Sequence, residues 1–60
     1  MKMLLLTGYD HREVAVMVND IIFIKDEAAG TRVEFIRDGK QFQIYVKESP
    51  KHIVMEANDD

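Results

Sequence analysis

The fold of this 60-residue chain is decided by the stretch Thr31-Arg32-Val33-Glu34-Phe35-Ile36-Arg37-Asp38-Gly39-Lys40-Gln41-Phe42-Gln43-Ile44-Tyr45-Val46-Lys47. Apolar and polar residues alternate on both sides of Asp38-Gly39, as in two strands joined by a two-residue turn. Both turn residues need a positive φ, which glycine adopts freely and aspartate tolerates. The stretch therefore predicts a β-hairpin.

A two-residue turn fixes which residues face each other across this hairpin. It places Arg37 opposite Lys40 and predicts, on one face, the pairs Phe35–Phe42, Val33–Ile44 and Thr31–Val46. The other face carries a more polar set: Arg32, Glu34, Ile36, Gln41, Gln43, Tyr45 and Lys47. A slip of one residue would pair apolar with polar positions, so the register is strongly specified.

Three further strands are expected before the hairpin. Lys2–Thr7 contains the continuous apolar run Met-Leu-Leu-Leu, which predicts a strand buried on both faces, or one with its second face against a partner. Glu13–Val18 is rich in β-branched residues and predicts a second strand after the polar loop Gly8–Arg12. Asn19-Asp20 breaks the pattern before a third strand at Ile21–Lys25.

The length of the next loop decides which way Ile22 and Ile24 point. A five-residue loop over 26–30, with Gly30 in a left-handed conformation, pairs Lys25 with Thr31, Phe23 with Val33 and Ile21 with Phe35. Ile22 and Ile24 then lie on the outer face, which is the interpretation we adopt. A loop that differs by one residue turns both isoleucines inward, and this alternative stays open.

The C-terminal segment changes from strand to helix. Ser49 is a good N-cap and Pro50 suits the first helical turn, so we expect a short helix from Pro50 to Met55. Residues 56–60, Glu-Ala-Asn-Asp-Asp, are predicted to be an acidic disordered tail. The expected architecture is mainly β: a single domain over residues 1–55, with a small antiparallel sheet or open barrel of four to five strands and a short C-terminal helix.

The residue content argues against an enzyme and against a bound cofactor or metal. There is no cysteine, and the two histidines, His11 and His52, are too far apart for a zinc motif. Each of the three glycines stands alone, so no phosphate-binding loop is present. A Ser49–His52 catalytic pair would lack an orienting acid, and Ser49 is better explained as a helix cap. We assign no catalytic, cofactor-binding or metal-binding residue.

Length and composition favour a soluble, cytoplasmic protein that forms a homo-oligomer, a dimer or higher. The apolar run near the N-terminus is too short for a signal peptide, and no segment approaches a membrane span. A chain of 60 residues buries only about 60% of its unfolded surface and has no disulfide to compensate. Association with other chains is therefore the expected source of additional stability.

The mixed apolar patch on the outer face of the sheet is the predicted partner-binding site. Clustered exposed isoleucines suggest an interface, and Tyr and Arg are favoured anchors in interfaces. The candidate residues are Ile22, Ile24, Arg32, Ile36 and Tyr45. An exposed edge strand, with Lys2–Thr7 as the candidate, would offer a second contact by strand addition.

Several short motifs resemble those of a known family. These are Leu6-Thr7-Gly8, Val18-Asn19 before an Ile-rich strand, Thr31-Arg32-Val33, Asp38-Gly39-Lys40 and Val46-Lys47-Glu48-Ser49. Together they resemble the small FlbD-like flagellar and swarming-motility proteins of bacteria and phages, over most of residues 4–54. The second half is also similar to the hairpin core of LytTR-type domains. The resemblance implies a small β-rich protein that acts by binding, with no catalytic residues.

The leading hypothesis is thus a non-enzymatic binding or regulatory protein that self-associates and binds a partner protein through an apolar sheet face. The alternative is a nucleic-acid-associated regulator of the LytTR type, which would use Lys25, Arg32, Arg37, Lys40 and Lys47. A net charge of −3 disfavours this alternative, because nucleic-acid binding relies on neutralising phosphates. A third hypothesis is a small-molecule site between subunits.

Overall fold

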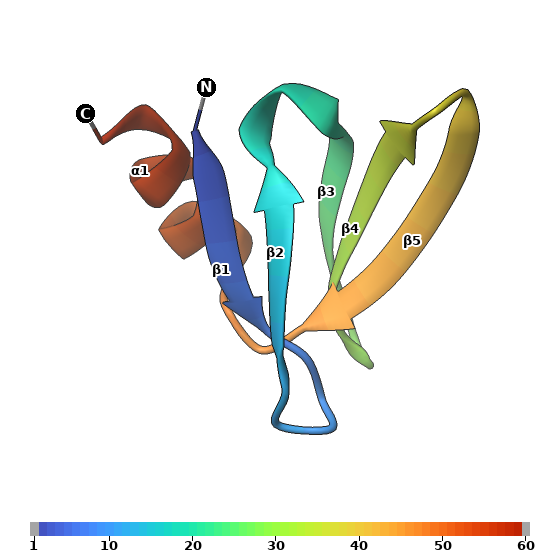
Figure 1. Ribbon diagram of the computed structural model, residues 1–60. Helices are drawn as coiled ribbons and strands as arrows, with labels where there is room; N and C mark the ends of the chain where they lie inside the picture. Colours follow the sequence, from blue (N-terminus) through green and yellow to red (C-terminus); the bar gives the residue numbers. More distant parts are fainter. Residues whose placement is uncertain (1, 60) are drawn as a thin grey trace.

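The computed structural model describes residues 2–59, which form five β-strands, one 3₁₀ turn and one α-helix (Figure 1). The elements are β1 (Met3–Thr7), β2 (Glu13–Met17), the 3₁₀ turn at Val18–Asp20, β3 (Ile21–Glu27), β4 (Gly30–Arg37), β5 (Lys40–Val46) and α1 (Pro50–Asn58). The expected mainly β architecture with a C-terminal helix is confirmed. Of the two forms expected, an open sheet arrangement is found, because the strands of the described region do not close into a barrel.

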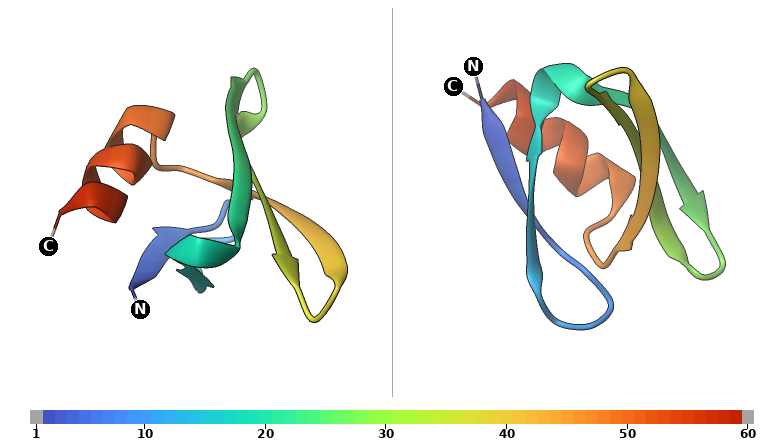
Figure 2. Two further views of the ribbon diagram at one scale, coloured as in Figure 1. Left: turned by 90° about the horizontal axis from the view of Figure 1, so that it is seen from above. Right: turned by 45° about the vertical axis from the view of Figure 1, so that its right-hand side comes forward.

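The strands form two antiparallel sheets that meet at one point. β1 and β2 make a hairpin, and β3, β4 and β5 make a three-stranded meander. The sheets join where Gly8 bridges Val46 and the Lys47 N–H donates to the Thr7 carbonyl at 2.8 Å. Figure 2 shows that the tip of the β4–β5 hairpin extends away from α1, on the far side of the molecule.

The β4–β5 hairpin has the predicted register throughout. Asp38 and Gly39 form its turn with φ values of 54° and 75°, and Arg37 faces Lys40. The pairs Phe35–Phe42, Val33–Ile44 and Thr31–Val46 are all observed. Near the tip, the rings of Phe35 and Phe42 stack with their centroids 5.5 Å apart. The alternating pattern and the Asp-Gly turn therefore fix this element locally.

The predicted pairing of β3 with β4 is correct only at its start. Ile21 faces Phe35 as expected, but Phe23 pairs with Glu34 and Lys25 with Arg32, in place of Val33 and Thr31. The strand continues to Glu27 and turns at Ala28-Ala29, so the loop is shorter than predicted and shifts the register by one residue. A β-bulge at Ile22 absorbs the difference.

This bulge separates the two isoleucines that we expected to share the outer face. Ile24 pairs with Val33 and packs against the core, so its predicted outward position is wrong. Ile22 is the extra residue of the bulge and stays 51% exposed. A bulge changes the parity of a strand, which explains why the alternative of two inward isoleucines is correct for Ile24 alone.

The core lies between the two sheets and α1. Its buried members are Leu4, Leu6, Val16, Val33, Val46 and Ile53, with Val14, Val18, Ile21, Ile24, Phe35, Ile44 and Ala57 packed around them. Leu4 and Leu6 come from one face of β1, whereas Ile53 and Ala57 come from one face of α1. The helix is thus held by its apolar stripe, as a short helix must be.

The helix begins where the sequence predicts and ends later. The Ser49 side chain accepts a hydrogen bond from the His52 backbone N–H at 3.1 Å, and Pro50 occupies the first turn, which confirms the predicted cap. Glu56, Ala57 and Asn58 are helical, so the expected end at Met55 is wrong and the predicted tail does not begin at Glu56. Ala57 packs on the core and extends the helix by a turn. Asp60 lies outside the described residues.

Gly30 allows the β1–β2 loop to contact the start of β4. Its φ is +132°, a conformation that side chains disfavour, and a Cβ atom there would overlap the ring of Tyr9. Gly30 therefore has the predicted positive φ, and its lack of a side chain also leaves space for the Tyr9 ring. This contact lies near the junction of the two sheets.

The bulge predicts that matched lysine substitutions in β3 change the free energy of unfolding by very different amounts. Ile24→Lys should lower the free energy of unfolding by about 2–4 kcal/mol, because it places a charge against the core. Ile22→Lys should change it by less than about 0.5 kcal/mol, because that side chain is exposed. Urea denaturation of both variants measures the difference, and equal effects would contradict the bulge.

Candidate binding surface

The predicted partner-binding residues do not form one patch. Arg32, Ile36 and Tyr45 lie on the outer face of the β3–β4–β5 sheet, where Arg32 faces Tyr45 as predicted. Ile36 is 42% exposed near the hairpin tip. Ile22 is exposed at the bulge, and Ile24 is on the core side. Three of the five candidates therefore share one face, but only Arg32 and Tyr45 lie opposite each other.

Arg32 and Tyr45 are engaged by neighbours on their own sheet. The Arg32 guanidinium lies 3.3 Å from Glu27 and 3.4 Å from Glu34, and it stacks over the Phe23 ring at 5.4 Å. The aromatic partner of Arg32 is thus Phe23, on the neighbouring strand β3. The Tyr45 hydroxyl donates to Glu27 at 2.9 Å.

These contacts make the part of the outer face of β3–β4–β5 around Arg32 polar, with most of its side chains paired to one another. The hydrogen bond to the Glu27 carboxylate, with partial burial, raises the pKa of Tyr45, which keeps the phenol a donor. Gln41 adds a hydrogen bond to Glu34 at 2.6 Å. A polar solvent face is the ordinary arrangement for an antiparallel sheet. This face therefore offers few free groups to a partner.

The outer face of β1–β2 has the opposite character. We call it the β1–β2 face, and it consists of Met3, Leu5, Ala15 and Met17. Met3 pairs with Met17, and Leu5 with Ala15, so the four side chains form one apolar cluster. Leu5 is 66% exposed and Met3 is 53% exposed. An antiparallel sheet that is apolar on both faces departs from the usual alternation of apolar and polar residues.

The sequence contained the signal for this surface in the run Met3-Leu4-Leu5-Leu6. That run predicts a strand with two apolar faces, and the structure shows that the chain covers one of them. The candidate set instead followed the isoleucines of the longer sheet. The sequence offered a partner as one cover for the second face of Lys2–Thr7, but the candidate residues did not include the β1–β2 face, because its exposure depends on how the two sheets meet.

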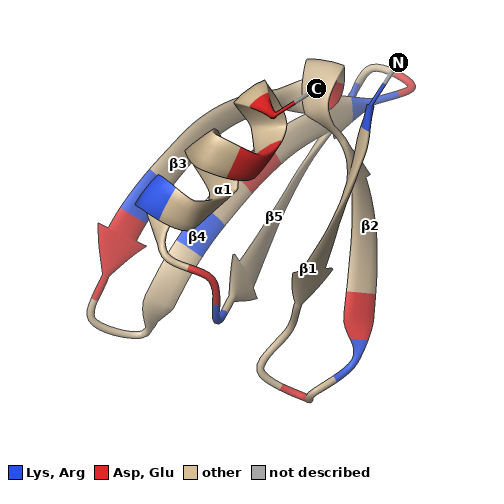
Figure 3. Cartoon of the chain, turned by 90° about the vertical axis from the view of Figure 1, so that its left-hand side faces the viewer, with Lys and Arg blue, Asp and Glu red and all other residues tan. Residues whose placement is uncertain are grey.

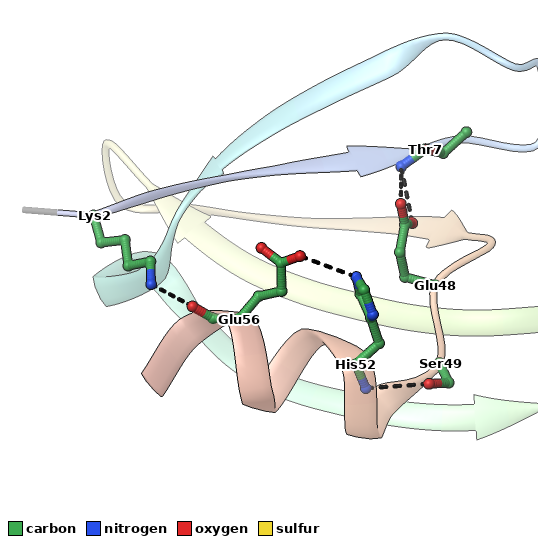
Figure 4. Close-up of polar contacts among 6 residues, drawn as sticks. All are labelled: Lys2, Thr7, Glu48, Ser49, His52 and Glu56. Atoms are coloured by element: carbon green, nitrogen blue, oxygen red, sulfur yellow. Dashed lines mark hydrogen bonds and ion pairs between the residues drawn. The ribbon is translucent and has the colours of Figure 1, made fainter. Parts of the chain in front are cut away.

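The end of β1 is tied to the segment that links β5 to α1. Both carboxylate oxygens of Glu48 accept from the Thr7 N–H, at 2.9 and 3.0 Å (Figure 4). The Lys47 N–H donates to the Thr7 carbonyl. Burial alone would raise the pKa of Glu48, but the hydrogen bonds from Thr7 lower it overall. The carboxylate therefore stays ionised and fixes the edge of the sheet.

The polar side chains of α1 serve the helix itself. Ser49 accepts from the backbone of His52, whereas the His52 imidazole lies 3.1 Å from the Glu56 carboxylate one turn later (Figure 4). Serine oxygen and imidazole are thus directed to different partners. Within residues 2–59, no group of three or more metal-ligating side chains comes together. Over the same range, α1 has neither the length nor the composition of a helix that could cross a membrane.

The cations considered for nucleic-acid binding are dispersed. Lys25 and Arg32 face each other in mid-sheet, and Arg32 is paired with two glutamates. Arg37 and Lys40 lie at the hairpin tip, at the opposite end of β5 from Lys47, which contacts His11 at 2.8 Å. These cations are spread from mid-sheet to both ends of β5, with carboxylates among them. They do not form the basic stripe typical of phosphate contacts.

Comparisons of the chain with protein-family models, with curated proteins and with solved structures found no match. The resemblance to FlbD-like proteins therefore stays a prediction.

Glu48 gives a pH-dependent prediction for stability. Because its pKa is lower in the folded state, its contribution is present above the pKa of an unfolded glutamate and is lost as the pH falls through the folded pKa. Glu48→Gln should cost about 1 kcal/mol at pH 7, the difference between charged and neutral hydrogen bonds. Urea denaturation should show that the gap between the two proteins closes as the pH falls through the folded pKa of Glu48. A constant gap between them would contradict this role.

Proposed function

We propose that this chain is a non-enzymatic binding protein that self-associates and holds a partner protein through the β1–β2 face. The observation that carries the proposal is the exposure of Met3 and Leu5 beside Ala15 and Met17, on a face with no charged side chain between them. Removing a large aliphatic side chain from water contributes about 1.5–3 kcal/mol, enough to drive selective binding.

The distribution of apolar residues supports two separate contacts. Among residues 2–59, nine large apolar side chains are exposed: Met3, Leu5, Tyr9, Ile22, Phe23, Ile36, Phe42, Val54 and Met55. They lie on both sheets, on the first loop and on α1, so one flat partner cannot cover them all. Self-association through one group would leave the β1–β2 face available for a partner.

Solution mass tests the self-association part of the proposal. Sedimentation velocity at high micromolar concentration should give a mass above that of the 7.0 kDa single chain. A monomer over the whole concentration range would remove self-association and leave only the partner-binding part.

A matched pair of lysine variants tests the partner-binding part. Leu5→Lys places a charge in the β1–β2 face, whereas Gln43→Lys places one on the polar face of β5. Affinity capture from cells that make the protein should recover a partner with the wild type and with Gln43→Lys. Recovery with Leu5→Lys should fall at least tenfold, because burying the lysine charge is unfavourable. Equal recovery by all three proteins would contradict the proposal.

A further inference from the structure

The outer edge of β1 carries backbone groups that the chain leaves open. The Val18 N–H donates to the Lys2 carbonyl, so Lys2, Leu4 and Leu6 are the residues of β1 that bond to β2. Met3, Leu5 and Thr7 direct their N–H and C=O groups to the opposite edge. Thr7 has partners there, but within the described part of the chain Met3 and Leu5 have none.

At Thr7, the outer edge of β1 already accepts hydrogen-bonding partners from another part of the chain. The end of β5 reaches β1 at Gly8 and Thr7, and the chain then turns at Ser49 into α1. The Glu48 carboxylate takes the place that the carbonyl of a neighbouring strand would have beside the Thr7 N–H. The pairing of β5 with β1 therefore stops just before Leu5 and Met3.

The surroundings of this edge are apolar on one side and acidic on the other. Met3 and Leu5 project on the β1–β2 face. Lys2 donates to the carbonyls of Glu56 and Asp59 and holds the end of α1 near the start of β1. Figure 4 shows the Glu56 side chain pointing from α1 toward β1, and Figure 3 shows β1 beside the acidic end of the helix.

We propose that the edge of β1 at Met3–Leu5 accepts an extended segment of the partner protein, whose alternate residues are apolar and basic. Main-chain hydrogen bonds to Met3 and Leu5 would provide affinity, as in other cases of strand addition. Side chains on one face of the added strand would extend the β1–β2 face, and those on the other would lie near Glu56. This inference rests on the proposed function and specifies the binding mode.

The available area favours a peptide strand over a second copy of the chain. Two five-residue strands present about 160 Å² of sheet, from their usual rise and spacing. A stable dimer needs about 800 Å² per partner, several times more. An extended segment avoids this problem, because it uses the backbone edge and the adjoining face together.

Proline substitutions test the edge, and Leu5→Ala measures the part of any loss that comes from the Leu5 side chain, because this side chain also belongs to the β1–β2 face. Leu5→Pro removes the N–H that points outward and should leave the hydrogen bonds to β2 intact, since proline is tolerated on an edge strand. Ala15→Pro is the matched control, because Ala15 faces Leu5 and directs its N–H to the opposite edge of β2. Thermal melting should confirm that both variants fold.

The probe is a seven-residue peptide of alternating lysine and valine, and its binding is measured by fluorescence anisotropy. Leu5→Pro should bind at least tenfold more weakly than Leu5→Ala, whereas Ala15→Pro should differ from wild type less than twofold. A peptide with alternate N-methylated amides should not bind, and this control needs no variant of the protein. A peptide of alternating glutamate and valine should bind at least tenfold more weakly. The proposal would be overturned if the lysine peptide bound equally well to wild type and to a folded Leu5→Pro variant, or equally well to Leu5→Ala and to that variant. It would also be overturned if the N-methylated peptide bound as well as the unmodified one.

The captured partner separates this proposal from the proposed function. If Leu5→Lys loses the partner and Leu5→Pro keeps it, the face binds the partner without strand addition, and the edge proposal is wrong. If both variants keep the partner, the proposed function fails as well. Loss by Ala15→Pro with retention by Leu5→Pro would place the added strand on β2 and overturn the assignment to β1.

Discussion

The junction between Thr7 and the Lys47–Glu48 segment is the contact on which the rest of the structure depends. It is the place where the two sheets are hydrogen-bonded to each other, and it combines a backbone bond with an ionised carboxylate. It also fixes the direction in which the chain leaves β5, and therefore where α1 begins. Because Ser49 and Pro50 start a helix at once, the strand cannot continue along β1, and the edge beyond Thr7 stays open.

The two sheets differ in the character of their outer faces. The β3–β4–β5 sheet neutralises its outer face internally, through Glu27, Glu34 and Arg32. The β1–β2 hairpin contributes Leu4, Leu6 and Val16 to the core and leaves an apolar outer face. A chain of 60 residues cannot cover both faces of every strand, because its surface is large relative to its volume. The face that it leaves uncovered is therefore informative about function.

The open edge of β1 adjoins its exposed apolar face. An open strand edge is usually protected by charge, by proline or by a covering element, since it otherwise pairs with other chains. Within the described residues, Thr7 is protected because Glu48 accepts its N–H. The exposed apolar residues Met3 and Leu5 have no such partner on this edge. A surface that combines unpaired backbone with apolar side chains provides both the affinity and the selectivity that strand addition requires.

The sequence alone determined the elements whose signals are local. Alternation and Asp38-Gly39 specify the β4–β5 register, and Ser49-Pro50 specifies the start of α1, because turn and cap geometry depend on neighbouring residues. Tertiary structure decided the bulge at Ile22, the inward position of Ile24 and the extension of α1 through Ala57, since each depends on what the core can hold. It also decided which face of β1 is exposed. The Met-Leu-Leu-Leu run predicts two apolar faces, but only the meeting of the two sheets determines which face is buried.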